Sequence, residues 1–138
     1  MPVLAIGVFD LFHKGHVELL RQARELGSRL VVVINGDEFT ARYKRRPSIN
    51  EEDRLHVVRS CRHVDDAVIA HGANARPYIE RYGIRIVVHG DDWEHSSYMK
   101  QICLDEDYLR SQRVELRYIP YYRGESTSAI INRIKRSD

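Results

Sequence analysis

The sequence predicts an α/β fold in which a parallel five-stranded sheet carries helices on both faces. Apolar runs alternate with amphipathic stretches along the whole chain. The runs are short and continuously apolar, as expected for strands buried on both faces, and a stretch with helical spacing follows each of them. This alternation is typical of a parallel sheet with crossover helices. A chain of 138 residues suffices for one core, so we expect a single domain over 1–138.

The five predicted strands place three unusual loops at one edge of the sheet. The strands are the apolar runs 3–9, 29–35, 66–70, 85–90 and 114–119. Parallel sheets bind ligands at the carboxyl ends of their strands, near the point where the strand order reverses. The loops after the first, fourth and fifth strands read "FDLFHKGH", "HGDDWEH" and "YYRGESTS". Function is therefore expected at these loops.

Apolar spacing and end signals predict the helices between the strands. The predicted helical ranges are 15–26, 50–61, 74–83, 96–112 and 126–136. Gly27 follows the first helix and Gly83 ends the third, as is common at C-termini. Asn50 is a predicted N-cap with acidic residues in the following turn. Ser126 or Thr127 is expected to cap the last helix.

Composition excludes several classes of protein. The chain is 43% hydrophobic and 30% charged, with a net charge of +2, which predicts no partner by itself. No apolar run has the length of a membrane span, and the N-terminus has no signal-type pattern. Cys61 and Cys103 form no ligand spacing and are expected to be reduced thiols in a cytoplasmic protein. The spacing of His71, His89 and His95 matches no metal motif, so no protein metal site is predicted.

The segment "HKGH" has the features of an anion site. His13 and His16 lie three residues apart where a predicted strand passes into a helix. The free N–H groups and the positive dipole end of that helix favour an anion, and Gly15 allows a ligand to approach the backbone. Two imidazoles on one side of the turn can donate to oxygens of one polyphosphate. The alternative is a pair of ordinary polar loop histidines.

Four motifs carry a resemblance to a known family. "GVFDLFHKGH", "RHVDDAV", "HGDDWE" and "GESTSAI" resemble, in that order, segments of the HxGH-type cytidylyltransferases. The closest match is to glycerol-3-phosphate cytidylyltransferase, with the ethanolamine- and choline-phosphate enzymes further off. The resemblance implies a Rossmann-like nucleotidyltransferase fold, often dimeric. It also implies attack of an acceptor phosphate on the α-phosphorus of CTP, with pyrophosphate leaving.

The catalytic residues expected from this resemblance neutralise charge and position phosphates. His13 and His16 are expected to donate to the α-phosphate and the bridging oxygen. Lys44 and Arg45, in the basic run 43–46, are expected to reach the phosphates of both substrates from a mobile lid, although a solvated charged loop is the alternative. A nucleic-acid partner is not expected, because no second basic or aromatic patch supports one. Arg123 completes the expected catalytic set.

Two sets of binding residues follow from the same resemblance. Those expected at CTP are Val8, Phe9, Asp10, Gly15, His16, Asp92, Gly124, Glu125, Ser126 and Thr127. Those expected at the acceptor are Asp10, Arg62, Trp93, Tyr121 and Tyr122. Asp10 is expected either to orient a histidine or to contact Mg²⁺, the one cofactor expected. Core packing is the alternative for Trp93, an ordinary ion pair with Asp65 for Arg62, and plain N-capping for Ser126 and Thr127.

The segment before the last helix departs from the family. The family reads R-T-E-G-I-S-T, whereas Tyr121 stands here at the arginine and Arg123 at the glutamate. This loop borders the acceptor pocket, so the acceptor is either of the glycerol 3-phosphate type or a phosphonate, such as the 2-hydroxyethylphosphonate used in fosfomycin biosynthesis. The expected activity is transfer of CMP from CTP to that small acceptor. The alternatives are an ATP-dependent adenylyltransferase and a non-catalytic nucleotide-binding domain of a larger protein.

Overall fold

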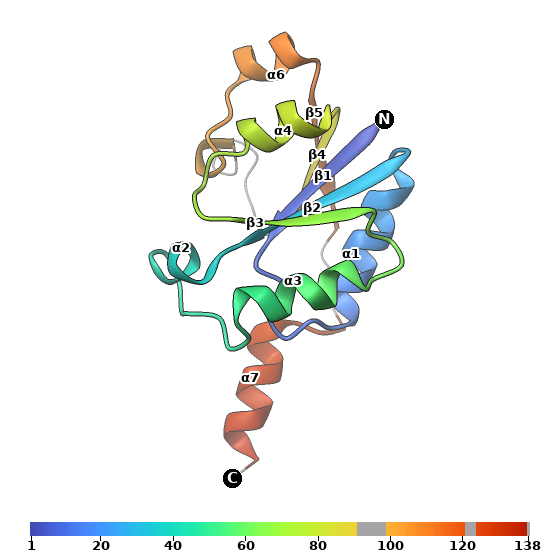
Figure 1. Ribbon diagram of the computed structural model, residues 1–138. Helices are drawn as coiled ribbons and strands as arrows, with labels where there is room; N and C mark the ends of the chain where they lie inside the picture. The colour runs from blue at the N-terminus through green and yellow to red at the C-terminus, as the bar shows by residue number, and fades with distance from the viewer. Residues whose placement is uncertain (91–98, 121–123, 138) are drawn as a thin grey trace.

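A five-stranded parallel sheet forms the centre of the molecule. The computed structural model describes residues 1–90, 99–120 and 124–137. The strands are β1 (Pro2–Gly7), β2 (Arg29–Asn35), β3 (Asp66–Ala70), β4 (Ile86–Gly90) and β5 (Glu115–Ile119). They pair in the order β3-β2-β1-β4-β5, and every pairing is parallel (Figure 1). The predicted α/β fold is confirmed, and the strand order reverses between β1 and β4 as in Rossmann-like folds.

Helices cover both faces of this sheet. They are α1 (Lys14–Glu25), α2 (Asp37–Ala41), α3 (Glu51–Arg59), α4 (Arg76–Tyr82), α6 (Glu106–Gln112) and α7 (Thr127–Arg136). Leu20 of α1 and Val58 of α3 pack on one face, against Val3 and Ala5 of β1. Residues of α4 and α6 pack on the other face, around Leu4. Successive residues of β1 thus enter opposite cores, which explains its continuous apolar run.

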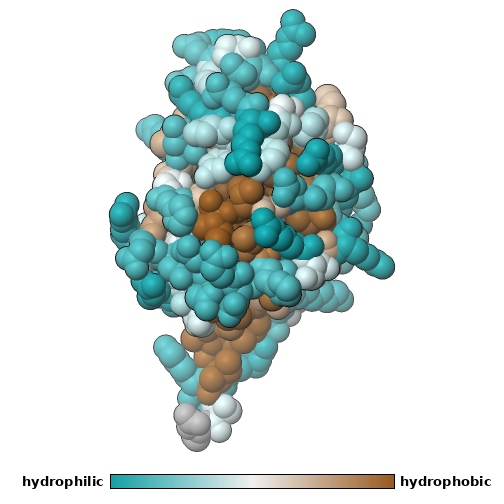
Figure 2. All heavy atoms as spheres, in the orientation of Figure 1, coloured by the Kyte–Doolittle hydropathy of each residue, from teal (hydrophilic) through white to brown (hydrophobic). Residues whose placement is uncertain are grey.

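Helix α7 differs from the others because no residue in it is buried. It projects from the body of the molecule near the start of α3 (Figure 1). Apolar side chains gather along the visible side of this projecting helix (Figure 2). Within the described ranges, no helix is long and apolar enough to cross a membrane.

Most predicted helix ends are confirmed, with two corrections. Asn50 accepts a hydrogen bond from the N–H of Asp53, Gly83 ends α4 in the left-handed region, and Ser126 caps α7. The continuous helix expected over 96–112 is wrong in its described part, because a turn at Cys103, with φ of 63°, interrupts it before α6. The short helix α2 is not among the predicted helices, because its five residues have too little periodicity to be recognised.

Candidate active site

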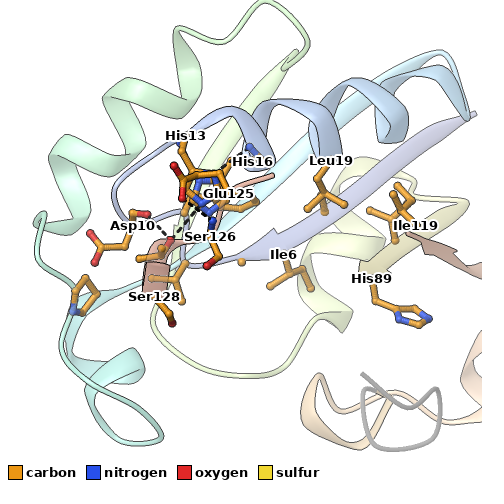
Figure 3. A pocket seen from close by; sticks show the side chains of 18 of the residues that line it. Ile6, Asp10, His13, His16, Leu19, His89, Ile119, Glu125, Ser126 and Ser128 are labelled. Carbon is orange, nitrogen blue, oxygen red and sulfur yellow. Dashed lines mark hydrogen bonds between the residues drawn. The ribbon is translucent and has the colours of Figure 1, made fainter. Parts of the chain in front are cut away.

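The larger of two neighbouring pockets lies at the carboxyl ends of β1, β4 and β5. Its volume is about 390 Å³, within the usual range for small-molecule sites. His13, His16 and Ser126 stand together at one end of it, whereas His89 and Ile119 lie at the other (Figure 3). Leu19 and Ile6 line the stretch between these ends (Figure 3). The pocket therefore has a polar end, built from two helix N-termini, and a more apolar end.

The two histidines are fixed by the start of α1. The Nδ1 atom of His13 accepts from the N–H of Gly15 at 2.9 Å, and the N–H of His13 donates to Nδ1 of His16 at 3.2 Å. The two rings stack with centroids 3.9 Å apart. Because both Nδ1 atoms accept, the neutral rings carry their protons on Nε2. A Cβ at position 15 would lie 2.7 Å from the His13 ring, so only glycine fits there.

Burial keeps both imidazoles neutral. It lowers the pKa of His16 to about 3, and the charges of His13 and Lys44 act in the same direction while Asp10 opposes them. Burial also lowers the pKa of His13, partly offset by the negative charge of Glu125. Each ring therefore offers one N–H donor at neutral pH and carries no charge in the free protein.

A buried arginine, Arg54 of α3, joins three backbone segments next to the pocket. It is 1% exposed and pairs with Asp37 at 2.7 Å. It also donates to the carbonyl oxygens of Val8, Asn35 and Ile49 at 2.7 to 2.9 Å. These bonds join the loop that follows β1, the end of β2 and the end of the basic loop, which is the segment 42–50 between α2 and α3 that carries the basic run. Arg54 is not among the site residues predicted from the sequence; its place four residues before Val58, on the apolar side of α3, was the available signal.

Asp10 fastens the basic loop to the loop after β1. Its carboxylate accepts from the N–H groups of Ser48 and Ile49, at 2.8 and 3.0 Å, and pairs with Arg45 at 3.0 Å. Burial alone would raise the pKa of Asp10, but these hydrogen bonds and the Arg45 charge hold it below its usual value. The carboxylate is thus already occupied by three donors. It positions Arg45 at the pocket rim.

The start of α7 meets the histidines from the opposite side. The Thr127 hydroxyl donates to the carbonyl oxygen of Asp10 at 3.0 Å and lies 3.5 Å from Nε2 of His13. Ser126 caps the helix by accepting from the N–H of Ala129. Glu125 pairs with Arg133 at 2.8 Å, and this hydrogen bond, foremost, lowers the pKa of Glu125. The two helix N-termini therefore face each other across the polar end of the pocket.

The structure brings most of the expected site residues into this pocket. Those lining it are Val8, Phe9, Asp10, His13, Gly15, His16, Lys44, Arg45, Glu125, Ser126 and Thr127. Gly124 directly precedes this set.

Arg62 is exposed after α3, and it is not part of this lining. The ion pair considered for Arg62 with Asp65 does not form; Asp65 pairs with Arg24 at 3.0 Å instead. Asp92, Trp93, Tyr121, Tyr122 and Arg123 lie outside the described residues.

The described residues do not form a ligand set for Mg²⁺. Over 1–90, 99–120 and 124–137, no group of three or more His, Cys, Asp or Glu side chains could hold a metal ion. The Asp10 carboxylate, the expected candidate, already accepts three hydrogen bonds. A Mg²⁺ ion bound there directly would have to displace part of the basic loop.

Comparison with known proteins identifies the family. A family model described as cytidylyltransferase-like matches residues 4–133. The chain belongs to the cytidylyltransferase-like family. It is 35% identical over 134 residues to FAD synthase from Pyrococcus abyssi, covering 96% of this chain and 90% of that protein. It is 33% identical over 129 residues to glycerol-3-phosphate cytidylyltransferase from Bacillus subtilis, covering 93% and 92% of the two chains.

A solved structure agrees with this assignment. The lipopolysaccharide core biosynthesis protein from Thermoplasma volcanium matches with a TM-score of 0.69 and 25% identity, over 91% of this chain and 98% of that one. The fold is thus that of the Rossmann-like nucleotidyltransferases. The relatives carry the names of nucleotidyltransferases, and this cytidylyltransferase-like chain is an enzyme of that class.

Proposed function

We propose that this enzyme transfers CMP from CTP to the phosphate or phosphonate of a small acceptor and releases pyrophosphate. The observation that carries the proposal is the pair of opposed helix N-termini. One presents the Nε2 donors of His13 and His16, and the other presents Ser126 and Thr127, with 3.5 Å between Thr127 Oγ1 and His13 Nε2. Such an arrangement suits a chain of phosphates, because helix N-termini and N–H donors both favour anions.

In the proposed reaction the protein positions groups and neutralises charge. An acceptor oxygen forms a bond to the α-phosphorus of CTP, and the bond from that phosphorus to the bridging oxygen breaks. His13 and His16 donate to the α-phosphate and to this leaving oxygen, on which negative charge develops. Lys44 and Arg45, at the pocket rim, bind the phosphates of both substrates and offset their mutual repulsion. Ser126 and Thr127 hold the departing pyrophosphate.

Two further expectations, Mg²⁺ as the cofactor and a homodimer as the assembly, rest on the family resemblance. We expect Mg²⁺ to arrive on the oxygens of the triphosphate, which are ligands it prefers, because Asp10 is already engaged. We also expect a homodimer. Sedimentation of the purified protein tests the dimer, and a fully monomeric chain at micromolar concentration would contradict it.

Adenylyl transfer from ATP to FMN is the second candidate. The match to an FAD synthase over 90% of that protein's length supports it. The pair of substrates distinguishes the two candidates, because the first needs CTP with a small phosphate or phosphonate and the second needs ATP with FMN.

A pyrophosphate-release assay tests the proposal. CTP and ATP are each offered with glycerol 3-phosphate, 2-hydroxyethylphosphonate, phosphoethanolamine, phosphocholine and FMN. We expect release with CTP and a small acceptor, abolished in His16→Ala. Release only with ATP and FMN would establish the second candidate. No release with any pair would overturn both candidates.

A further inference from the structure

A second, smaller pocket adjoins the first at the end of β1. Its volume is about 110 Å³, and it is lined by the ends of β2 and β3, by α2 and by the start of α4. The two pockets share Ile6, Gly7, Val8 and Lys44. We propose that this second pocket holds the head group of the acceptor, and that Asn35 and Tyr43 select a small, uncharged, hydroxyl-bearing group. This inference rests on the proposed transfer reaction.

The shared wall gives the acceptor its orientation. Lys44 borders both pockets, so a phosphate bound by its ammonium group lies beside the polar end of the larger pocket. An acceptor with its phosphate at Lys44, reaching away from the nucleotide, enters the smaller pocket. The phosphate then faces the α-phosphorus held by the histidines, and the head group lies on the far side of β1.

The polar groups in the smaller pocket are held in fixed places. The side-chain amide of Asn35 donates to the Tyr43 hydroxyl at 3.0 Å, and Asn35 is only 7% exposed. The carbonyl oxygen of Asn35 accepts from Arg54 at 2.8 Å, which fixes its backbone. The Tyr43 ring packs against Phe39, with centroids 5.3 Å apart. An amide and a phenol both donate and accept, which matches hydroxyl groups.

Size and charge narrow the class of head group. A pocket of about 110 Å³ is well below the roughly 300–1,000 Å³ of typical small-molecule sites, so it suits a group of a few carbons and not a flavin ring. The Lys44 ammonium lies 5.9 Å from the centroid of the Tyr43 ring. That ammonium is already paired with the acceptor phosphate, so a cationic head group would need a separate counter-charge in the smaller pocket. Within the described part of the chain, no carboxylate lines the pocket to supply one. Hydroxyl-bearing acceptors are therefore favoured over ammonium-bearing ones.

An isosteric charge change tests the assignment. Asn35→Asp places a carboxylate in the smaller pocket, and Asn132→Asp makes the same change on exposed α7 as a control. The readout is the ratio of kcat/KM for phosphoethanolamine to that for glycerol 3-phosphate, with CTP. We expect Asn35→Asp to raise this ratio at least tenfold while the KM for CTP stays within about twofold. Asn132→Asp is expected to leave both unchanged.

A second variant keeps the test decisive if Asn35→Asp does not fold. Tyr43→Phe removes the hydroxyl from a half-exposed ring, and we expect the KM for glycerol 3-phosphate to rise about five- to tenfold with the KM for CTP unchanged. Two results would overturn the head-group assignment. One is a wild-type enzyme that prefers FMN or phosphoethanolamine. The other is that Asn35→Asp leaves the acceptor ratio unchanged and Tyr43→Phe leaves the KM for glycerol 3-phosphate unchanged. Absence of turnover with every acceptor is a different result, because it overturns the proposed reaction itself.

Discussion

The two helices that face each other across the active site are anchored in opposite ways. Helix α1 lies on the sheet, and its Leu20 is 0% exposed in the core. Helix α7 has no buried residue, and its Ile134 is 62% exposed. The start of α7 is tied to the body by polar contacts, among them Thr127 with Asp10. The histidine half of the site is thus pre-organised by the core, whereas the half at α7 depends on a few hydrogen bonds.

The largest expected effect concerns the anchor of the first half. Arg54→Met removes the charged partner of buried Asp37 and takes a guanidinium donor away from three carbonyl oxygens, of which that of Asn35 keeps the Thr40 hydroxyl. We expect the free energy of unfolding to fall by about 3–5 kcal/mol, measured by urea denaturation. Arg46→Met, at an exposed pair with Glu38, is the control and is expected to cost under about 0.5 kcal/mol. Equal losses in the two variants would refute the anchoring role.

Removing a histidine tests catalysis in the same half. His16→Ala deletes one of the two neutral Nε2 donors, so we expect kcat for pyrophosphate release to fall roughly 10²- to 10³-fold. His71→Ala, on an exposed turn outside the pocket lining, is the matched control and is expected to keep full activity. A His16→Ala enzyme with unchanged kcat would show that the imidazole takes no part in the transfer.

The lowered pKa of His16 gives a stability prediction. The folded protein keeps this ring neutral down to about pH 3, whereas the unfolded chain binds a proton near pH 6.5. The unfolded state therefore holds more protons between these values, and unfolding becomes easier as the pH falls. We expect His16 to account for a loss of about 2 kcal/mol between pH 7 and pH 5. Urea denaturation of His16→Gln over this range should show a correspondingly smaller loss; an unchanged pH dependence would contradict the burial of the ring.

A smaller effect is expected at the α7 half. Thr127→Val removes the hydroxyl that bonds to the Asp10 carbonyl and lies beside His13. We expect kcat/KM for CTP to fall about tenfold, which corresponds to the loss of roughly one neutral hydrogen bond that positions the start of α7. Thr127→Ser keeps the hydroxyl and should retain most of the activity. Equal losses in both variants would point to the methyl group rather than the hydrogen bond.

A contrast between local patterns and tertiary contacts explains which features of the molecule could be predicted from the sequence. The strands and the His13–His16 turn depend on local patterns, namely apolar runs and a strand-to-helix junction, so they were predicted closely. Arg54 was missed because its partners lie 5 to 46 positions away in the sequence. Asp10 was placed in the site, but its role in holding Ser48 and Ile49 comes from a contact between distant loops. The position of Arg54 on the apolar side of α3 indicates burial, but its partners, like those of Asp10, are set by tertiary contacts that no local pattern shows.

The smallest effect is expected on the exposed side of α7. Ile134→Lys replaces a side chain that is 62% exposed, so we expect the free energy of unfolding to change by under about 0.5 kcal/mol. Leu20→Ala on α1, by comparison, empties a fully buried position and should cost about 2–5 kcal/mol. Urea denaturation at several protein concentrations measures both. A loss above about 1 kcal/mol at Ile134 that grows as the protein is concentrated would show that a second copy covers α7, because only an association that buries this isoleucine gives such dependence.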